Sequence, residues 1–136
     1  MDVFGNAMEI RTTGAETAGA FSLLAITVAS GGFAPLPHVH RREAELFVVV
    51  AGELEFLVGD EVRTLGPGGT LHVPAGVLHQ FRNPFDAEAR MVFLHAPALD
   101  GFFVELGELA ARGAPDPTTL APLMARWGME VAAVGG

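Results

Sequence analysis

The sequence predicts an all-β fold, a sandwich or barrel, followed by a short helical C-terminal extension. Short apolar or alternating stretches recur through the first 97 residues, and clusters of Gly, Pro, Asp and Asn separate them. Many short strands at close spacing are typical of sandwiches and barrels. Helical periodicity appears only after this part. We therefore interpret residues 1–97 as a β-barrel and residues 98–136 as a helical extension packed on the same domain.

The strands are expected where apolar stretches lie between turn-forming residues. They span residues 7–12, 21–29, 45–50, 53–58, 61–65, 70–74, 78–82 and 90–96. If Ala51 and Gly52 form a two-residue turn, the third and fourth strands pair as a hairpin. Its inward face would carry Glu45, Phe47, Val49, Leu54, Phe56 and Val58. This face resembles a barrel interior with one carboxylate near the mouth.

Two helices are expected in the extension. Residues 100–112 place apolar side chains at helical spacing, and residues 117–127 follow Asp116 as N-cap with Pro117 at the first helical position. Pro122 lies inside the second segment, so we expect a kink or break there. The remaining residues 128–136 are mostly small and apolar, and we expect them to be partly disordered.

The amino-acid composition excludes several kinds of catalytic site. All eight basic residues are Arg, and the sequence contains neither Cys nor Tyr. Schiff-base chemistry, thiolate nucleophiles, sulfur-ligated metals and phenolic acids are therefore excluded. Five His, sixteen carboxylates and the hydroxyls of Ser and Thr remain. They point to a metal site built from His and carboxylates, or to no catalysis.

Charge and hydropathy limit the partners. The net charge is −8, whereas nucleic acids and anionic membranes attract basic surfaces, so neither is expected as a partner. The longest apolar run, residues 46–51, is too short to span a bilayer. The N-terminus has no basic stretch followed by an apolar run, so we expect no secretory signal and a cytoplasmic location.

Four side chains form a candidate metal site. His38 and His40 are two residues apart, so both imidazoles point to one side of an extended chain. Glu45 begins an inward-facing strand, and His79 follows the tight turn at residues 74–76. Three imidazoles and one carboxylate suit Fe, Mn, Co, Ni, Cu or Zn, whereas Ca and Mg prefer oxygen ligands.

The same stretches resemble the two motifs of the cupin superfamily. The first, Gly-x5-His-x-His-x4-Glu-x6-Gly, is met by Gly32, His38, His40, Glu45 and Gly52. The second, Gly-x5-Pro-x-Gly-x2-His-x3-Asn, is met by Gly68, Pro74, Gly76, His79 and Asn83. The spacer of residues 53–67 is the short one of microbial cupins, and Gly69 departs from the Asp found in many relatives. The resemblance implies a double-stranded β-helix (jelly-roll) barrel that holds one divalent transition metal through His38, His40, Glu45 and His79.

The predicted helical extension indicates which group of cupins the sequence resembles. Residues 100–107 and 123–130 look like the helical tail of small cupins similar to quercetin 2,3-dioxygenase. That likeness implies a metal-dependent dioxygenase that uses O₂ on an aromatic or polyphenolic hydroxyl compound, with Glu45 as a catalytic residue that accepts the hydroxyl proton. Two alternatives stay open. One is an isomerase, epimerase or lyase whose metal polarises a carbonyl, and the other is a non-enzymatic small-molecule binder.

Further residues are assigned by their place in the pattern. The candidate substrate-binding side chains are Phe47, Phe56, Phe81, Phe93 and His95, with ordinary core packing as the alternative. If they line a cavity, the substrate is aromatic or apolar. We interpret His72 as a core residue, and Glu43, Arg41 and Arg42 as loop charges. The outward face at residues 46–50 is also apolar, so another sheet or a second subunit should cover it, and we expect a homodimer.

Overall fold

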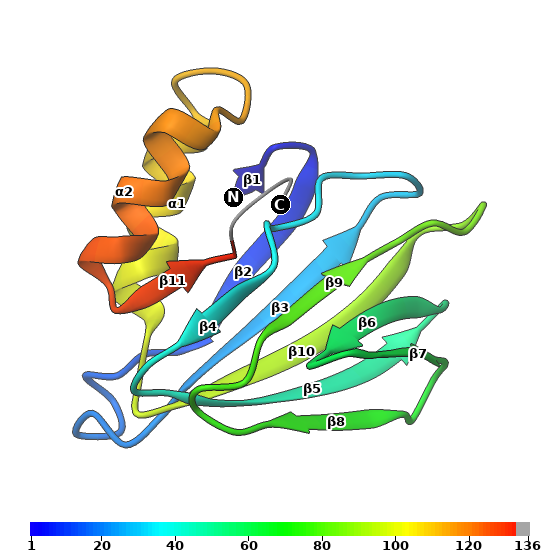
Figure 1. The fold of residues 1–136 in the computed structure, drawn as a ribbon, viewed down its shortest axis with the longest axis horizontal. Helices are drawn as coiled ribbons and strands as arrows, with labels where there is room; N and C mark the ends of the chain where they lie inside the picture. The colour runs from blue at the N-terminus through cyan, green and yellow to red at the C-terminus, as the bar shows by residue number, and fades with distance from the viewer. Residues whose placement is uncertain (133–136) are drawn as a thin grey trace.

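Two antiparallel sheets face each other, and two helices pack at one end of them (Figure 1). The computed structural model describes residues 1–132. The first sheet has the order β1 (Asp2–Val3), β2 (Asn6–Thr12), β3 (Ser22–Val28), β10 (Ala89–Ala96), β5 (Ala44–Ala51) and β8 (Thr70–Val73). The second has the order β11 (Met129–Val131), β4 (His38–His40), β9 (His79–Arg82), β6 (Leu54–Val58) and β7 (Glu61–Leu65). The helices are α1 (Asp100–Ala110) and α2 (Pro117–Arg126). The predicted all-β architecture with a helical C-terminal part is confirmed.

Every expected strand is present, and three short strands were not expected. These are β1, β4 and β11, each of two or three residues. A periodic pattern needs about four residues before it can be recognised, so strands this short leave no signal in the sequence. Two of them matter for the site, because β11 pairs with β4 along its whole length.

The predicted hairpin between residues 45–50 and 53–58 is wrong. Strand β5 pairs with β10 and β8 in one sheet, whereas β6 pairs with β7 and β9 in the other. Gly52 lies at the crossing with a φ of 71°, and a Cβ there would come within 2.6 Å of the Glu88 carbonyl oxygen. A side chain would therefore block the close approach that lets the chain change sheets.

The predicted inward face survives this correction. Phe47, Val49, Leu54 and Phe56 are each at most 1% exposed. Both strands turn the same residues toward the space between the sheets, even though they do not pair. On the opposite face, Leu46 and Val50 are 36% and 51% exposed, so no described part of this chain covers them. The homodimer stays a prediction.

The extension packs against the barrel. Helix α2 begins as expected, because the Asp116 carboxylate accepts the Thr118 N–H at 2.9 Å and Pro117 occupies the first turn. Pro122 does not break it, and the helix continues to Arg126 while its apolar side chains pack inward.

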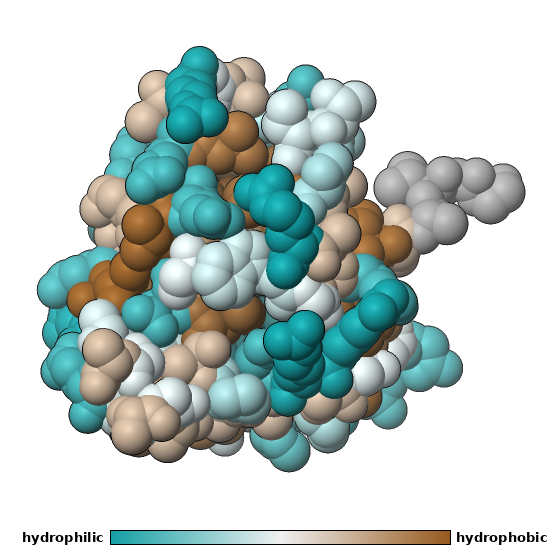
Figure 2. Space-filling model, turned by 90° about the vertical axis from the view of Figure 1, so that its left-hand side faces the viewer, coloured by the Kyte–Doolittle hydropathy of each residue, from teal (hydrophilic) through white to brown (hydrophobic). Residues whose placement is uncertain are grey.

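Figure 2 shows the side of the molecule that carries the helices. On this face hydrophobic residues appear only as patches among hydrophilic ones.

The C-terminal segment contains a short strand. Residues 129–131 form β11, whereas residues 133–136 lie outside the described residues, so the expected partial disorder of residues 128–136 stays a prediction. Within residues 1–132, neither helix is long and apolar enough to cross a membrane.

Candidate metal centre

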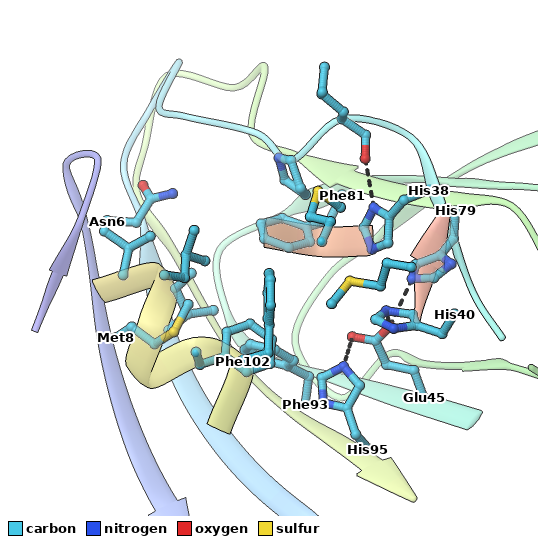
Figure 3. A pocket seen from close by; sticks show the side chains of 18 of the residues that line it. Asn6, Met8, His38, His40, Glu45, His79, Phe81, Phe93, His95 and Phe102 are labelled. Atoms are coloured by element: carbon cyan, nitrogen blue, oxygen red, sulfur yellow. Dashed lines mark hydrogen bonds and ion pairs between the residues drawn. The ribbon is translucent and has the colours of Figure 1, made fainter. Parts of the chain in front are cut away.

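The four predicted ligands come from both sheets and meet between them (Figure 3). His38 and His40 lie on β4, and His79 lies on the neighbouring strand β9, directly opposite His38. Glu45 comes from β5 in the facing sheet. All four side chains are buried, whereas Val39, between the two histidines, is partly exposed. The alternation of a strand thus places both imidazoles of β4 inside, as the sequence predicted.

Residues of the two motifs hold the elements that carry these ligands. Gly76, with a φ of 86°, ends the turn before β9, and its N–H donates to the His40 carbonyl oxygen at 2.8 Å. This bond ties the second motif to β4. The Asn83 amide donates to the carbonyl oxygens of Val28 and Ala87 at 3.1 and 2.9 Å. Asn83 therefore has a structural role in the turn after β9.

The Glu45 carboxylate lies among imidazole nitrogens. Its Oε1 is 2.8 Å from His79 Nε2 and 3.2 Å from His40 Nε2, and its Oε2 is 2.9 Å from His95 Nε2. His38, His40 and His79 each offer a ring nitrogen within 4.8 Å of the others. The structure therefore brings all four predicted ligands together and adds His95 beside them.

The proton positions on two imidazoles follow from their neighbours. His38 Nδ1 is 2.6 Å from the Leu36 carbonyl oxygen, and His79 Nδ1 is 3.0 Å from that of Val77. Because a carbonyl oxygen only accepts, each Nδ1 carries a proton, and in the neutral ring Nε2 keeps a lone pair. For His79 that lone pair faces Glu45 Oε1. Two lone pairs at 2.8 Å repel unless a proton or a cation lies between them.

The cluster fits a divalent metal ion. His79 Nε2 and Glu45 Oε1 are buried and have no hydrogen-bond partner of suitable direction, although they lie close together. Buried polar atoms without a partner are rare, because each costs about 1–3 kcal/mol. Imidazole nitrogens and a carboxylate oxygen are ligands that first-row transition metals accept. His38, His40, Glu45 and His79 would hold such an ion.

The electrostatics of the cluster also suit a cation. Burial, together with the neighbouring imidazoles of His79 and His40, lowers the pKa of His38 to about 3. Burial alone would raise the pKa of Glu45, but His95 and the other imidazoles hold it well below its ordinary value. Burial would lower the pKa of His79, but the Glu45 carboxylate raises it. At neutral pH the cluster therefore offers a neutral His38 and an ionised Glu45.

Acidification is expected to destabilise the metal-free protein between about pH 6.5 and 3, and His38 should contribute. Its folded-state pKa is about 3 and its ordinary value is 6.5, so in this window only the unfolded chain takes up the proton. The free energy of unfolding then falls by roughly 1 kcal/mol per pH unit from this group. The raised pKa of His79 does not oppose this slope, because its stabilisation is already complete below pH 6.5.

Urea unfolding at several pH values measures this effect. The variant His38→Asn should lose the His38 part of the slope, and the exposed His72 provides the control, since His72→Asn should keep it. An equal slope in wild type and His38→Asn would contradict the predicted pKa.

A cavity of about 70 Å³ extends from the cluster between the sheets to the helices. Of the candidate substrate-binding residues, Phe47, Phe81, Phe93 and His95 line it. Phe56 does not, because it packs beside Phe47 with ring centroids 5.1 Å apart. In Figure 3 the cluster lies at one end and Asn6 and Met8 at the other.

Much of the cavity wall comes from outside the two motifs. These lining residues include Val3, Met8, Ile26, Phe102, Phe103, Leu106, Leu120, Met124 and Met129. The helical periodicity of the extension was visible in the sequence, but it indicates only that an apolar face packs somewhere. The pattern does not indicate whether the apolar face of these helices closes a cavity or fills a core.

Two assignments of single residues are corrected. His72 is exposed on the outer face of β8 and is not a core residue. Glu43 is only 5% exposed, so it is not a solvated loop charge. Arg41 and Arg42 are exposed as expected, and Arg41 pairs with Glu130 of β11.

Comparisons with known proteins agree with this arrangement. SchB of Streptomyces halstedii is 38% identical over 82 residues, and this match covers 60% of the chain and 59% of SchB. The structure of KdgF from Halomonas sp. is similar with a TM-score of 0.66 and 22% identity, over 74% of this chain and 87% of KdgF. The polyketide cyclase RemF from Streptomyces resistomycificus gives a TM-score of 0.59 and 20% identity, over 67% and 64% of the two chains.

The likenesses to KdgF and RemF establish the fold alone. The family is shown by the sequence, because residues 24–95, more than half of the chain, match the Cupin_2 family, described as a cupin domain. This stretch contains all four proposed ligands and His95. The chain therefore belongs to the cupin family.

Proposed function

We propose that this protein is a metal-dependent dioxygenase that uses O₂ on a small, neutral aromatic compound carrying a hydroxyl group. One observation carries the proposal: a buried cluster of three imidazoles and a carboxylate forms one end of a cavity that is otherwise lined mainly by apolar side chains. A metal ion held by His38, His40, Glu45 and His79 would bind the substrate oxygen and supply the redox chemistry with O₂.

The side chains around the ion would orient the substrate and move its proton. Phe47, Phe81 and Phe93 line the cavity and would hold an aromatic ring by apolar and edge-to-face contacts. Glu45 is the one carboxylate among the described residues that line the cavity, and it would accept the hydroxyl proton. His95 Nε2 lies 2.9 Å from Glu45 Oε2, so this imidazole can stabilise Glu45 in either protonation state.

The cavity chemistry favours a neutral substrate and an oxygenase. Among the described residues that line the cavity, His95 is the one ionisable side chain beyond the four proposed ligands. No Arg within residues 1–132 lines it, so a phosphate or carboxylate group would meet no Arg there. Isomerases and epimerases commonly use separate acid and base groups on opposite faces of the substrate, which this wall does not offer. A buried site with mainly apolar walls would also protect reactive species from water.

The size of the cavity implies that its wall adapts. A volume of about 70 Å³ is far below the roughly 300–1,000 Å³ typical of sites for drug-sized ligands. Met8, Met124 and Met129 line the cavity, and the flexible thioether side chain of Met repacks at low cost. We expect a ring-sized substrate to enter by moving these side chains.

A second candidate is a non-redox reaction in which the metal polarises a carbonyl, such as a cyclisation. The presence of His95 favours it, because a buried imidazole beside Glu45 provides one further proton donor or acceptor. RemF, which shares the fold, is described as a polyketide cyclase. A barrel that only binds its ligand is the third possibility.

Measuring oxygen consumption distinguishes the three candidate functions. The metal-free protein is loaded with Fe(II), Mn(II), Co(II) or Ni(II), and O₂ uptake is followed with a panel of flavonols and catechols. We expect uptake with at least one metal and none in the metal-free protein. Carbonyl turnover without O₂ would replace the dioxygenase by the second candidate. Saturable binding without turnover in any loaded form would leave a binding protein.

A further inference from the structure

Glu43 is a buried carboxylate whose charge has no role in the proposed reaction. It lies between β4 and β5, two residues before Glu45, and is only 5% exposed. Its Oε1 has no hydrogen-bond partner and is 3.7 Å from His40 Nδ1, which also has none. The two atoms without partners thus face each other on the side of the His40 ring away from Glu45.

His40 differs from the other two proposed imidazole ligands, because its Nδ1 has no backbone acceptor. His38 and His79 each direct Nδ1 to a backbone carbonyl oxygen, of Leu36 and Val77, two residues earlier in the chain. These acceptors fix the proton on Nδ1 and leave Nε2 for the cluster. His40 also directs Nε2 to the cluster, 3.2 Å from Glu45 Oε1, but the group at its Nδ1 is the Glu43 carboxylate.

We propose that Glu43 is a positioning residue for the metal centre, a proposal that rests on the metal site described above. With a metal ion at Nε2, the Glu43 carboxylate would accept a hydrogen bond from the Nδ1–H of His40 and would thereby fix the tautomer and the orientation of this ring. A carboxylate behind a ligating imidazole also makes the imidazole a stronger donor to the metal. His40 would therefore be the most strongly donating of the three imidazoles.

Charge provides an independent reason for this role. A divalent ion with Glu45 as the one anionic ligand leaves a net positive charge among buried groups, which is costly in a medium of low polarity. The Glu43 carboxylate, one imidazole away, offsets that charge. Glu43 is not itself in either group of side chains whose donor atoms converge, so it is placed to act through His40.

The separation of 3.7 Å is longer than a hydrogen bond. A cation at Nε2 withdraws electron density from the ring and makes the Nδ1 proton a stronger donor. Metal loading is therefore expected to shorten the contact between His40 and Glu43.

The test compares Glu43→Gln, which keeps an acceptor but removes the charge, with Glu43→Leu, which removes both. Competition titrations give the affinity for Co(II), and the visible spectrum of bound Co(II) reports the ligand field. We expect Glu43→Leu to bind Co(II) about 10- to 100-fold more weakly with a changed spectrum, and Glu43→Gln to lie between it and wild type. The exposed Glu88 supplies the control, since Glu88→Gln should match wild type.

Affinities and spectra equal to wild type in both Glu43 variants would overturn the role of Glu43 while leaving the metal site intact. A wild-type protein that binds no Co(II) would instead overturn the metal site itself, and the role of Glu43 with it. If the variants do not fold, proton NMR of the wild-type Co(II) protein decides the question. Three shifted, exchangeable imidazole N–H signals support the bond to His40, and two contradict it.

Discussion

Replacing His79 by alanine is expected to lower the affinity for a divalent metal by more than about 100-fold. Loss of outer partners of metal ligands typically costs 10- to 100-fold, and loss of a ligand costs more. His79 faces His38 across the β4–β9 ladder, and its Nε2 lies 2.8 Å from Glu45 Oε1. Without this imidazole the carboxylate loses its nearest neighbour in the cluster.

Equilibrium dialysis with Co(II) or Ni(II), followed by elemental analysis, measures this loss. His72→Ala is the matched control, because His72 is exposed on the outer face of β8 and lies outside the cluster. We expect the control to bind one ion per chain as tightly as wild type. Equal metal content in His79→Ala and His72→Ala would remove His79 from the proposed ligand set.

Turnover should depend on Glu45 even where metal is bound. The variant Glu45→Gln keeps the size and one ligating oxygen of the side chain, but the amide cannot accept the substrate proton. Proton transfer by a positioned side chain typically contributes 10²- to 10⁴-fold, so we expect kcat to fall by about this factor at saturating metal. Rates are compared per bound ion, with Glu88→Gln as the control.

A turnover per bound ion within about twofold of wild type would show that Glu45 is a ligand only. The metal-free variant gives a second result. Without the carboxylate, burial lowers the pKa of His79 and only the hydrogen bond to the Val77 carbonyl oxygen still raises it, so this pKa should fall below its value in wild type. An NMR titration of the imidazole signals measures this shift.

The convergence of the four proposed ligands could be predicted because its information is local. His38 and His40 share a face by strand alternation, and Glu45 and His79 stand at fixed spacings within two short motifs. Glycine and proline in those motifs mark the turns that redirect the chain. The prediction required no knowledge of which strands pair, and the error in the hairpin of residues 45–58 therefore did not affect it.

The pairing itself could not be predicted from the same signals. Gly52 between two apolar strands predicts a tight turn, but a hairpin and a crossing between sheets both need one. The difference lies in the approach of Gly52 to the Glu88 carbonyl oxygen, a contact between residues far apart in sequence. The burial of Glu43 was missed for a related reason, since the motif spacing selects Glu45 as the ligand and no local pattern shows that Glu43, in the loop before it, is buried against His40.

The cavity depends on tertiary packing even more strongly than the strand pairing does. The four candidate Phe residues of β5, β6, β9 and β10 were placed on the inward face by alternation, and three of them line the cavity. Whether inward side chains fill a core or leave a space depends on the shapes of all the surrounding groups. Those groups include α1, α2 and β11, whose docking no local pattern specifies.

Anomalous X-ray scattering from crystals of the protein loaded with one equivalent of Co(II) or Zn(II) tests the metal centre most directly. We expect one strong peak between the Nε2 atoms of His38, His40 and His79 and the Glu45 carboxylate, at about 2.0–2.2 Å from its ligands. Loaded crystals in which these four side chains keep their places and the peak lies elsewhere, or is missing, would contradict the proposed site.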